Sequence, residues 1–512
     1  MNIFKPAPLV ILLACQPQAG PDENPTDSGI GLLGEGLLNP YPSVHLMADD
    51  LLNLPEIEPG GQGTKLPVDE MDWRNGFSPS QTAIVSLETV NTDALPYWQE
   101  PTPGEGGVLL VDLTDGAFLP VMAELDAHPD ADPPVLVIRP LTQLPFNHRI
   151  AVVITTDTTE RPQRFDDLIG GNPPSSLADY ADHYETLIDD LSTLQISTES
   201  IALAFDFPVS DPTITLTSAL DQLDPLDTYE FRNQRDLDNG DVVAPYTWRV
   251  AEGVLGVQDF LIDDERLDRN DDGTVNVVGT TDADLYVHIP TSVQDAAEGT
   301  VPIMVFGHGI FSKPGNYLDQ SDDPSGVNQL AEEGGFIVIA TVWRGLTWKD
   351  RADVVAAAND IGLLPSIPDR LVQGQIATQS LIHHIREGSL LDDDVFLGRS
   401  GQKLPNPDQL VYYGISLGGI EGAVLAANTT EFDAAVLHVP GSQWSTMLER
   451  SSNWTAFELF VANTVPDAAE RQLLYSLSQL WWDPVDPMSY AHALVNQSIL
   501  LQESIGDEQV PN

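Results

Sequence analysis

The chain has 512 residues, of which 42% are hydrophobic, and it carries 78 acidic against 22 basic residues, for a formal net charge of −56. This length predicts roughly two to four domains, and the hydrophobic fraction excludes a chain that is disordered throughout. The negative charge repels phosphate backbones and so excludes nucleic acid as a partner. It suits saline surroundings, where salt screens the self-repulsion, and equally an ordinary well-hydrated surface.

The first fifteen residues predict an export signal that ends in a lipid-attachment site. Lys5 is followed by an apolar run, residues 9–13, that is too short to span a bilayer. Residues 12–15, Leu-Leu-Ala-Cys, resemble a bacterial lipobox, and Cys15 is the only cysteine. The resemblance implies cleavage before Cys15 and a diacylglycerol on its thiol. We therefore expect an anchored protein of the bacterial cell envelope, with an ordinary secretory signal as the alternative.

Residues 16–44 are predicted to form a flexible tether, and residues 45–245 a β-rich N-terminal domain. Short runs rich in β-branched residues alternate with Pro, Gly and Asp clusters, which is typical of strands joined by turns. The apolar residues of 176–194 recur every three or four positions and predict an amphipathic helix. The predicted strands are 81–88, 106–113, 134–140, 148–156 and 201–209.

From residue 246 to residue 512 the pattern predicts an α/β domain. Strands rich in Val, Ile and Leu alternate with helices, which indicates a doubly wound, mostly parallel sheet with helices on both faces. The expected strands are 284–291, 301–309, 335–342, 409–416, 432–440 and 497–504. The expected helices are 327–334, 366–387 and 419–427.

The strongest chemical motif is Gly414-Ile415-Ser416-Leu417-Gly418, a G-x-S-x-G sequence between a predicted strand and a predicted helix. This is the setting of a nucleophile elbow, in which a strained serine projects its hydroxyl above the sheet. Gly414 and Gly418 allow the neighbouring backbone to pass closely. Ser416 is therefore the candidate nucleophile. The alternative is an ordinary strand-to-helix turn in which Ser416 caps the helix.

A second motif, residues 306–310 with the sequence Phe-Gly-His-Gly-Ile, directly follows a buried strand. It resembles the loop of α/β-hydrolases that helps to form the oxyanion hole. The resemblance implies that the N–H groups of Leu417 and Ile310 stabilise a developing alkoxide. Gly309 then gives the loop its close approach, and His308 has a structural role. A plain glycine-rich loop is the alternative.

The end of the chain, Gly506-Asp507-Glu508-Gln509-Val510-Pro511, follows the last predicted strand. It looks like the loop that carries the acid of the catalytic triad in α/β-hydrolases, and the resemblance assigns that role to Asp507, whose carboxylate would orient a histidine. The alternative is a solvent-exposed acid in a turn.

The histidine of such a triad follows the acid in chain order, yet none of the five residues after Asp507 is a histidine. We expect that the sequence is a fragment whose catalytic histidine lies beyond Asn512. His438, at the end of a predicted strand, is the alternative base.

Two weaker features complete the prediction. Asp268, Asn270 and Asp272 match the first half of a calcium loop, with a structural calcium ion or a simple turn as the two interpretations. Residues 441–490 are too long for a single crossover and predict a cap over the active site. Their tryptophans favour an apolar acyl chain or ring, or else they are ordinary packing. These four tryptophans are Trp444, Trp454, Trp481 and Trp482.

Together these features resemble an α/β-hydrolase, and more loosely the bacterial lipoprotein-type surface lipases and esterases with a β-rich N-terminal domain. The resemblance implies a carboxylic ester hydrolase with a small-molecule or lipid ester substrate, an acyl-enzyme mechanism and no required cofactor. A non-catalytic surface protein that keeps the fold for binding, and a peptidase of the same fold, are the alternatives. The sequence does not specify an oligomeric state.

Overall fold

The computed structural model describes residues 40–61, 64–97, 99, 102–128, 134–224, 226–237, 246–319 and 326–511. Cys15 and most of the predicted tether lie outside these described residues. In this described part of the chain, no helix combines the length and the apolar character that crossing a membrane requires.

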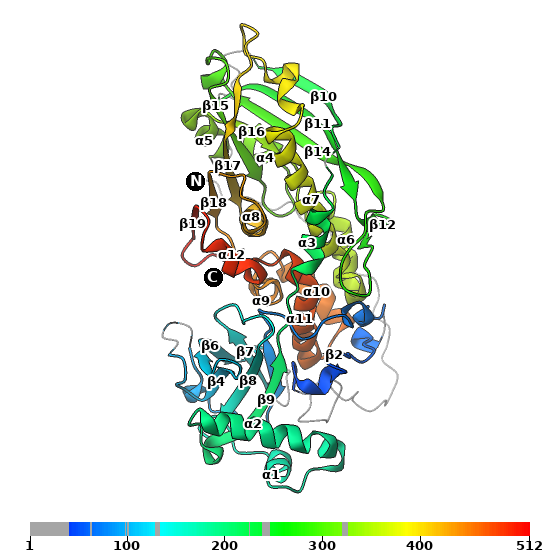
Figure 1. The fold of residues 1–512 in the computed structure, drawn as a ribbon, viewed down its shortest axis with the longest axis vertical. Coiled ribbons are helices and arrows are strands. Elements are labelled where there is room, and N and C mark those ends of the chain that lie inside the picture. Colours follow the sequence, from blue (N-terminus) through cyan, green and yellow to red (C-terminus); the bar gives the residue numbers. More distant parts are fainter. Residues whose placement is uncertain are drawn as a thin grey trace.

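The N-terminal region is β-rich, as predicted, and contains two antiparallel sheets at the lower end of the molecule (Figure 1). One sheet has the order β3-β7-β6 and the other β5-β4-β8-β9. The predicted amphipathic helix is α2 (Ala181–Thr193), which buries Tyr184, Leu187 and Leu191 and follows a 3₁₀ turn at Ser175–Tyr180. The strands are β3 (Ala83–Ser86), β4 (Val108–Asp112), β5 (Ala117–Leu119), β6 (Val121–Leu125), β7 (Val135–Pro140), β8 (Arg149–Thr155) and β9 (Ile201–Pro208).

The upper part of the molecule is built on an eight-stranded sheet with the order β10-β11-β14-β16-β15-β17-β18-β19 (Figure 1). The five strands from β16 to β19 are parallel, whereas β14 runs antiparallel to both of its neighbours. The strands are β10 (Tyr229–Asp236), β11 (Thr247–Asp259), β14 (Gly279–Pro290), β15 (Val301–Gly307), β16 (Ile337–Ala340), β17 (Pro405–Ile415), β18 (Ala434–His438) and β19 (Ile499–Gln502). This mixed, mostly parallel sheet confirms the predicted α/β-hydrolase fold class.

Strand β10 corrects the expected course of the chain, because it belongs to the upper sheet although it precedes residue 246. It pairs with β11 in a long antiparallel hairpin that forms one edge of the sheet. Its residues Tyr-Glu-Phe-Arg-Asn-Gln-Arg-Asp are mostly exposed, so hydrophobic patterning gave little sign of a strand. The upper sheet therefore begins at Tyr229.

Helices cover both faces of this sheet, as a doubly wound fold requires. On one face, Tyr412 of β17 packs against α8 (Leu417–Ala427), beside the buried helix α7 (Ser366–Arg386). On the other face, Tyr413 belongs to a cluster with residues of α4 (Gly315–Leu318) and α5 (Val327–Gly334). The alternation of the two tyrosines along β17 gives each face its own core.

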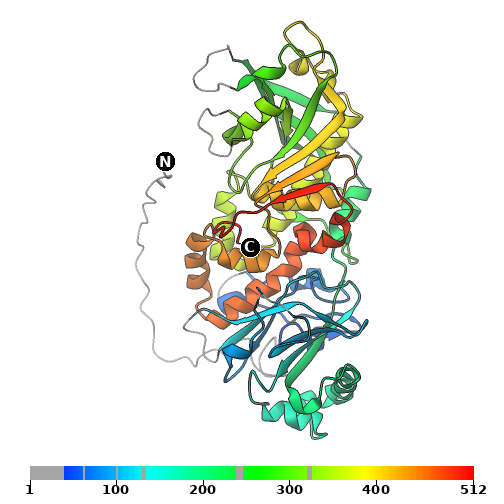
Figure 2. The same ribbon diagram turned by 90° about the vertical axis from the view of Figure 1, so that its left-hand side faces the viewer.

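The predicted cap region forms helices that lie between the sheet and the N-terminal domain (Figures 1 and 2). They are α9 (Trp444–Arg450), α10 (Thr455–Thr464) and α11 (Ala468–Trp482), and the short helix α12 (Ala491–Leu494) begins just after the predicted region. Arg74 of the N-terminal domain reaches the end of α11, where its guanidinium pairs with Asp483 at 2.6 Å. The cap is thus bonded to the domain below it as well as to the sheet.

A buried histidine of the sheet predicts how stability changes with pH. His288 on β14 is fully buried, neither ring nitrogen has a hydrogen-bond partner within the described structure, and burial lowers its pKa to about 3. The unfolded chain binds this proton below pH 6.5 and the folded chain does not. The contribution of His288 to the free energy of unfolding is therefore complete above about pH 6.5 and falls by roughly 1.4 kcal/mol per pH unit between that pH and the lowered pKa.

We expect His288→Leu to remove this part of the acid sensitivity. The measurement is the free energy of unfolding by urea at pH 7.5 and pH 5, compared between wild type and variant. His492→Leu, at an exposed position, is the control and should leave the difference unchanged. An identical pH dependence in wild type and His288→Leu would show that His288 titrates normally in the folded chain.

Candidate active site

Ser416 lies at the sharp turn between β17 and α8, with φ 55° and ψ −117°. L-residues rarely adopt this conformation, and the surrounding hydrogen bonds hold it in place. The N–H of Ser416 donates to the carbonyl of His438 at 2.9 Å, while its own carbonyl accepts the N–H groups of Gly419 and Ile420. The Ser416 side chain makes no capping hydrogen bond to the helix. Its hydroxyl is therefore not used as a helix cap.

Glycines bring three backbone segments into contact around this turn. A Cβ atom on Gly414 would overlap the carbonyl of Gly418, and one on Gly418 would overlap the carbonyl of Gly307 at the end of β15. The hydroxyl of Tyr412 donates to the Gly418 carbonyl at 2.6 Å and occupies the space beside Gly307. Close packing of this kind fixes where Ser416 stands above the sheet.

We expect Gly418→Ala to lower the free energy of unfolding by roughly 3 kcal/mol, because its methyl group meets backbone atoms that have no room to move. Urea unfolding measures the effect. Gly279→Ala is the matched control, since no heavy atom lies within 4 Å of its added Cβ. If both variants were equally stable, the tight contact between the elbow and β15 would be refuted.

The loop after β15 lies directly beside Ser416. A Cβ atom on Gly309 would be 3.6 Å from the Cβ of Ser416, so the two segments touch. Gly309 N–H donates to the hydroxyl of Tyr317 and Phe311 N–H donates to Leu346. Within the described part of the chain, the N–H groups of Ile310 and Leu417 have no acceptor, and Leu417 is the first residue of α8. Both residues line the same pocket as Ser416.

His308 joins this loop to the neighbouring strand end. Its Nε2 accepts the N–H of Trp343 at 3.0 Å, so the proton is on Nδ1, which donates to the carbonyl of Gly309 at 2.8 Å. Burial lowers the pKa of His308 to about 4, which keeps the ring neutral at neutral pH. Both ring nitrogens are thus occupied in holding the loop.

The pocket in front of Ser416 is apolar. Its walls come from the loop after β15, from helix α6 (Arg351–Asn359) and from the cap. Three of the four predicted cap tryptophans line it, and Trp444 stacks on Trp482 with centroids 4.9 Å apart. Trp481 is buried elsewhere. Five further residues line the pocket without any local signal in the sequence: Phe311, Leu346, Val354, Leu364 and Ile367.

Asp507 lies in the loop after β19, whose neighbouring residues Gln509 and Val510 form part of the pocket wall. One carboxylate oxygen of Asp507 accepts the N–H groups of Gln509 at 2.8 Å and Val510 at 2.9 Å. The loop is also bonded to the cap through Ser451, whose hydroxyl donates to the carbonyl of Gln509. Asp507 therefore shapes the pocket wall, and its carboxylate does not itself line the pocket.

None of the residues that line this pocket is a histidine, although all ten histidines of the chain are described. His438 approaches Ser416 only through its main-chain carbonyl. Its ring stacks on Tyr413, and its Nδ1 hydrogen-bonds the side chain of Gln502 on β19 at 3.1 Å. The geometry thus does not favour His438 as the base.

The predicted calcium loop is a turn after β13 (Arg266–Leu267) with its polar groups already bonded. Asp272 accepts two hydrogen bonds from Thr274, which lower its pKa. The side chain of Asn276 bonds both Asp268 and Asn270. These contacts explain the loop as a turn, and calcium binding stays a prediction.

Comparison with known proteins yields likenesses of shape alone. No family model and no curated protein matches the chain. An acylaminoacyl peptidase is 16% identical with a TM-score of 0.27, and the alignment covers 45% of this chain and 31% of the peptidase. A putative acetyl xylan esterase from Bacteroides fragilis is 15% identical with a TM-score of 0.34, over 56% of this chain and 66% of that one.

Acetyl xylan esterase 1 from Thermoanaerobacterium sp. is 14% identical with a TM-score of 0.32, over 58% of this chain and 86% of that one. This chain thus aligns with about a third of the length of the acylaminoacyl peptidase. Because these sequence identities and TM-scores are low, the fold is assigned from the strand order of the sheet and from the sharp turn at Ser416.

Proposed function

We propose that the chain is a serine hydrolase of carboxylic esters with Ser416 as its nucleophile. The observation that carries the proposal is the strained elbow of Ser416 beside two N–H groups, of Leu417 and Ile310, that have no acceptor in the described structure. Strain at a single polar residue, in front of an apolar pocket, is typical of a catalytic position.

The reaction proceeds through an acyl-enzyme. The Ser416 oxygen attacks the ester carbonyl, and the N–H groups of Leu417 and Ile310 stabilise the negative charge that develops on the carbonyl oxygen. The C–O bond to the alcohol then breaks and the alcohol leaves with a proton. Water next attacks the acyl-enzyme, releases the acid and returns the proton to Ser416. None of these steps requires a cofactor.

The proposal needs a group that takes the proton of Ser416, with Asp507 as the carboxylate that would orient it. Since no histidine of this chain lines the pocket, we expect its hydrolysis of esters to be slow. Added imidazole should accelerate it, because imidazole is a small base and Ser416 is partly exposed.

The same observation favours a second candidate, a non-catalytic protein that binds apolar acyl groups in this pocket. The two candidates differ in one result. An enzyme hydrolyses an ester at a rate that imidazole increases and that depends on Ser416. A binding protein retains the ligand without hydrolysing it. A peptidase of the same fold would cleave an amide substrate as well as an ester.

We propose that the acyl group of the substrate is apolar, because the pocket is walled by tryptophans and aliphatic side chains. The test compares p-nitrophenyl acetate with the octanoate, with imidazole added. The wild type should prefer the octanoate. Val354→Phe, which fills the pocket, should lower kcat/KM for the octanoate about tenfold and leave the acetate unchanged.

Val355→Phe is the matched control for this test. Val354 is 1% exposed and lines the pocket, whereas its neighbour Val355 is 38% exposed and points outward. Val355→Phe should behave as wild type. A preference for acetate, or equal effects of the two substitutions, would refute an apolar acyl site.

We also propose that the protein works at the bacterial cell envelope, attached through a lipid on Cys15. The support is the lipobox-like sequence of residues 12–15 and the lone cysteine. Two acyl chains on one cysteine are enough for stable membrane attachment. Metabolic labelling with a palmitate analogue in a bacterial host should mark the wild type, and Cys15→Ser should remove the label.

A further inference from the structure

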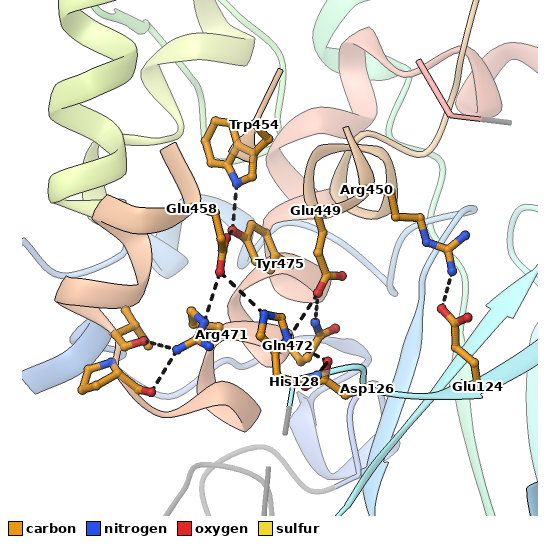
Figure 3. A network of polar contacts seen from close by, with 12 residues as sticks. Glu124, Asp126, His128, Glu449, Arg450, Trp454, Glu458, Arg471, Gln472 and Tyr475 are labelled. Atoms are coloured by element: carbon orange, nitrogen blue, oxygen red, sulfur yellow. Dashed lines mark hydrogen bonds and ion pairs between the residues drawn. The ribbon is translucent and has the colours of Figure 1, made fainter. Parts of the chain in front are cut away.

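A cluster of one histidine and three carboxylates lies between the N-terminal domain and the cap, and none of its four residues lines the Ser416 pocket (Figure 3). Asp126 and His128 follow β6 in the N-terminal domain, whereas Glu449 is on α9 and Glu458 on α10. One potential ligand atom each from Asp126, His128 and Glu449 lies within 4.8 Å of the other two. We propose that these three residues bind a divalent transition-metal ion of the zinc type, with Glu458 as the positioning residue.

The distances around the imidazole ring suit this arrangement. Nδ1 of His128 is 2.8 Å from Asp126 and 3.8 Å from Glu449. Ligand atoms about 2.0–2.2 Å from a tetrahedral metal ion stand roughly 3–4 Å apart, so one ion can contact all three groups with small side-chain shifts. Imidazole with carboxylates is a ligand set that zinc accepts, and water would fill the fourth position.

Independent support comes from a buried carboxylate oxygen. The side chain of Asp126 is 2% exposed, and its Oδ2 has no hydrogen-bond partner in the described structure. An unsatisfied buried carboxylate oxygen is costly, and coordination to a cation satisfies it.

Glu458 lies on the other side of the same ring. Its Oε1 is 3.8 Å from Nε2 of His128 and, although Arg471 is 3.3 Å away, it accepts no hydrogen bond in the described structure. Metal-binding histidines usually donate their second N–H to a carboxylate, which fixes the tautomer and the ring. Glu458, held by the hydroxyl of Tyr475, is placed for this role (Figure 3).

The ion would join two parts of the chain that are far apart in sequence, since Asp126 and His128 belong to the lower domain and Glu449 to the cap (Figure 3). The cap forms a wall of the Ser416 pocket. Metal binding should therefore hold the cap on the N-terminal domain and raise the temperature of unfolding.

A second cluster in the same domain, Asp112, Asp115 and His148, provides a matched control. Its buried member is already satisfied: Asp112 accepts the N–H groups of Thr114 and Asp115 on one oxygen and the ring of His148 on the other. It offers a histidine and two carboxylates of the same kinds but no orphan oxygen. Zinc should not prefer it.

The test is calorimetric titration of the chelator-treated full chain with Zn²⁺, in millimolar Mg²⁺ to occupy the acidic surface. We expect one site, and a rise in Tm on zinc addition. Affinity should fall at least tenfold in His128→Ala and in Glu449→Gln, and roughly 10–100-fold in Glu458→Gln with unchanged stoichiometry. His148→Ala should bind as wild type.

Loss of zinc binding could also result from misfolding, so the test uses two ligand variants, His128→Ala and Glu449→Gln. The second of these hardly changes the size of the side chain. Each variant is first compared with wild type by circular dichroism without zinc. Substitution of Co²⁺ adds a second readout, since four-coordinate cobalt absorbs strongly in the visible range and His128→Ala should lose this band. Absence of a saturable zinc site in wild type, or loss of zinc binding in His148→Ala with retention in His128→Ala, would overturn the proposal.

Discussion

Replacing Ser416 with alanine is expected to reduce the hydrolysis of a p-nitrophenyl ester by on the order of 10²-fold or more, measured in the presence of imidazole. Ser416 supplies the oxygen that forms the acyl-enzyme, so without it the tetrahedral intermediate that the N–H groups of Leu417 and Ile310 would stabilise is not formed. Complete triads lose more, on the order of 10⁶-fold, because their base is already in place.

Imidazole itself cleaves activated esters. The control must therefore distinguish hydrolysis that depends on Ser416 from direct cleavage by imidazole. Ser442→Ala is suitable, since Ser442 is partly exposed and does not line the Ser416 pocket. It should retain the full imidazole-dependent rate, and Ser416→Ala should retain only the rate of imidazole in buffer. Equal turnover in wild type and Ser416→Ala would leave the acyl-binding protein as the better account.

Arg74→Met is expected to lower the free energy of unfolding by roughly 3–5 kcal/mol, because it leaves the carboxylate of Asp483 buried without its cation. The two side chains are 1% and 0% exposed. The Arg74 guanidinium also donates to the carbonyl of Leu480 and to the hydroxyl of Ser210, so its loss breaks two contacts between the N-terminal domain and the cap and one within the N-terminal domain.

Unfolding in urea measures this effect, and two further variants make it specific. Lys65→Met breaks an exposed ion pair with Glu56, in which the side chains are 54% and 71% exposed, and should cost at most about 1 kcal/mol. The double variant Arg74→Met/Asp483→Leu should be less destabilised than the sum of the two single ones, because it removes both charges. If Arg74→Met cost no more than Lys65→Met, the buried pair would not join the two domains.

The parts of the fold that the sequence predicts well are those with a local signal. Strand β15 and the second half of β17 are apolar runs, and α5 and α7 begin and end within a residue or so of their predicted bounds. The elbow was equally visible, because its glycines and its place between strand and helix are neighbours in the chain. Local patterns of this kind are decided by steric rules that act over a few residues.

The features that the sequence does not predict depend on contacts between distant segments. Arg74 and Asp483 are 409 positions apart, and nothing near either residue indicates a buried pair. The wall of the pocket includes Val354 of α6 and Leu346 of a loop, which join the site only through the fold. Strand β10 was missed because an exposed edge strand carries charged residues on both faces.

The proton acceptor of Ser416 cannot be identified from local sequence patterns. The motif around Ser416 predicts a hydrolase, and Asp507 was assigned by resemblance to a loop. No histidine lines the pocket: His308 holds the loop after β15, and the ring of His438 stacks on Tyr413. Only the three-dimensional arrangement shows that neither of these two rings is placed to act as the base.

The most direct measurement is covalent labelling with a fluorophosphonate probe, followed by mass spectrometry of the peptides. Because the probe phosphonylates a serine that is activated and has access to an oxyanion site, the account predicts one adduct, on Ser416, that forms faster with imidazole and is absent from Ser416→Ala. A wild-type chain that acquires no adduct on Ser416, or the same labelling pattern as Ser416→Ala, would contradict the assignment of Ser416 as the nucleophile.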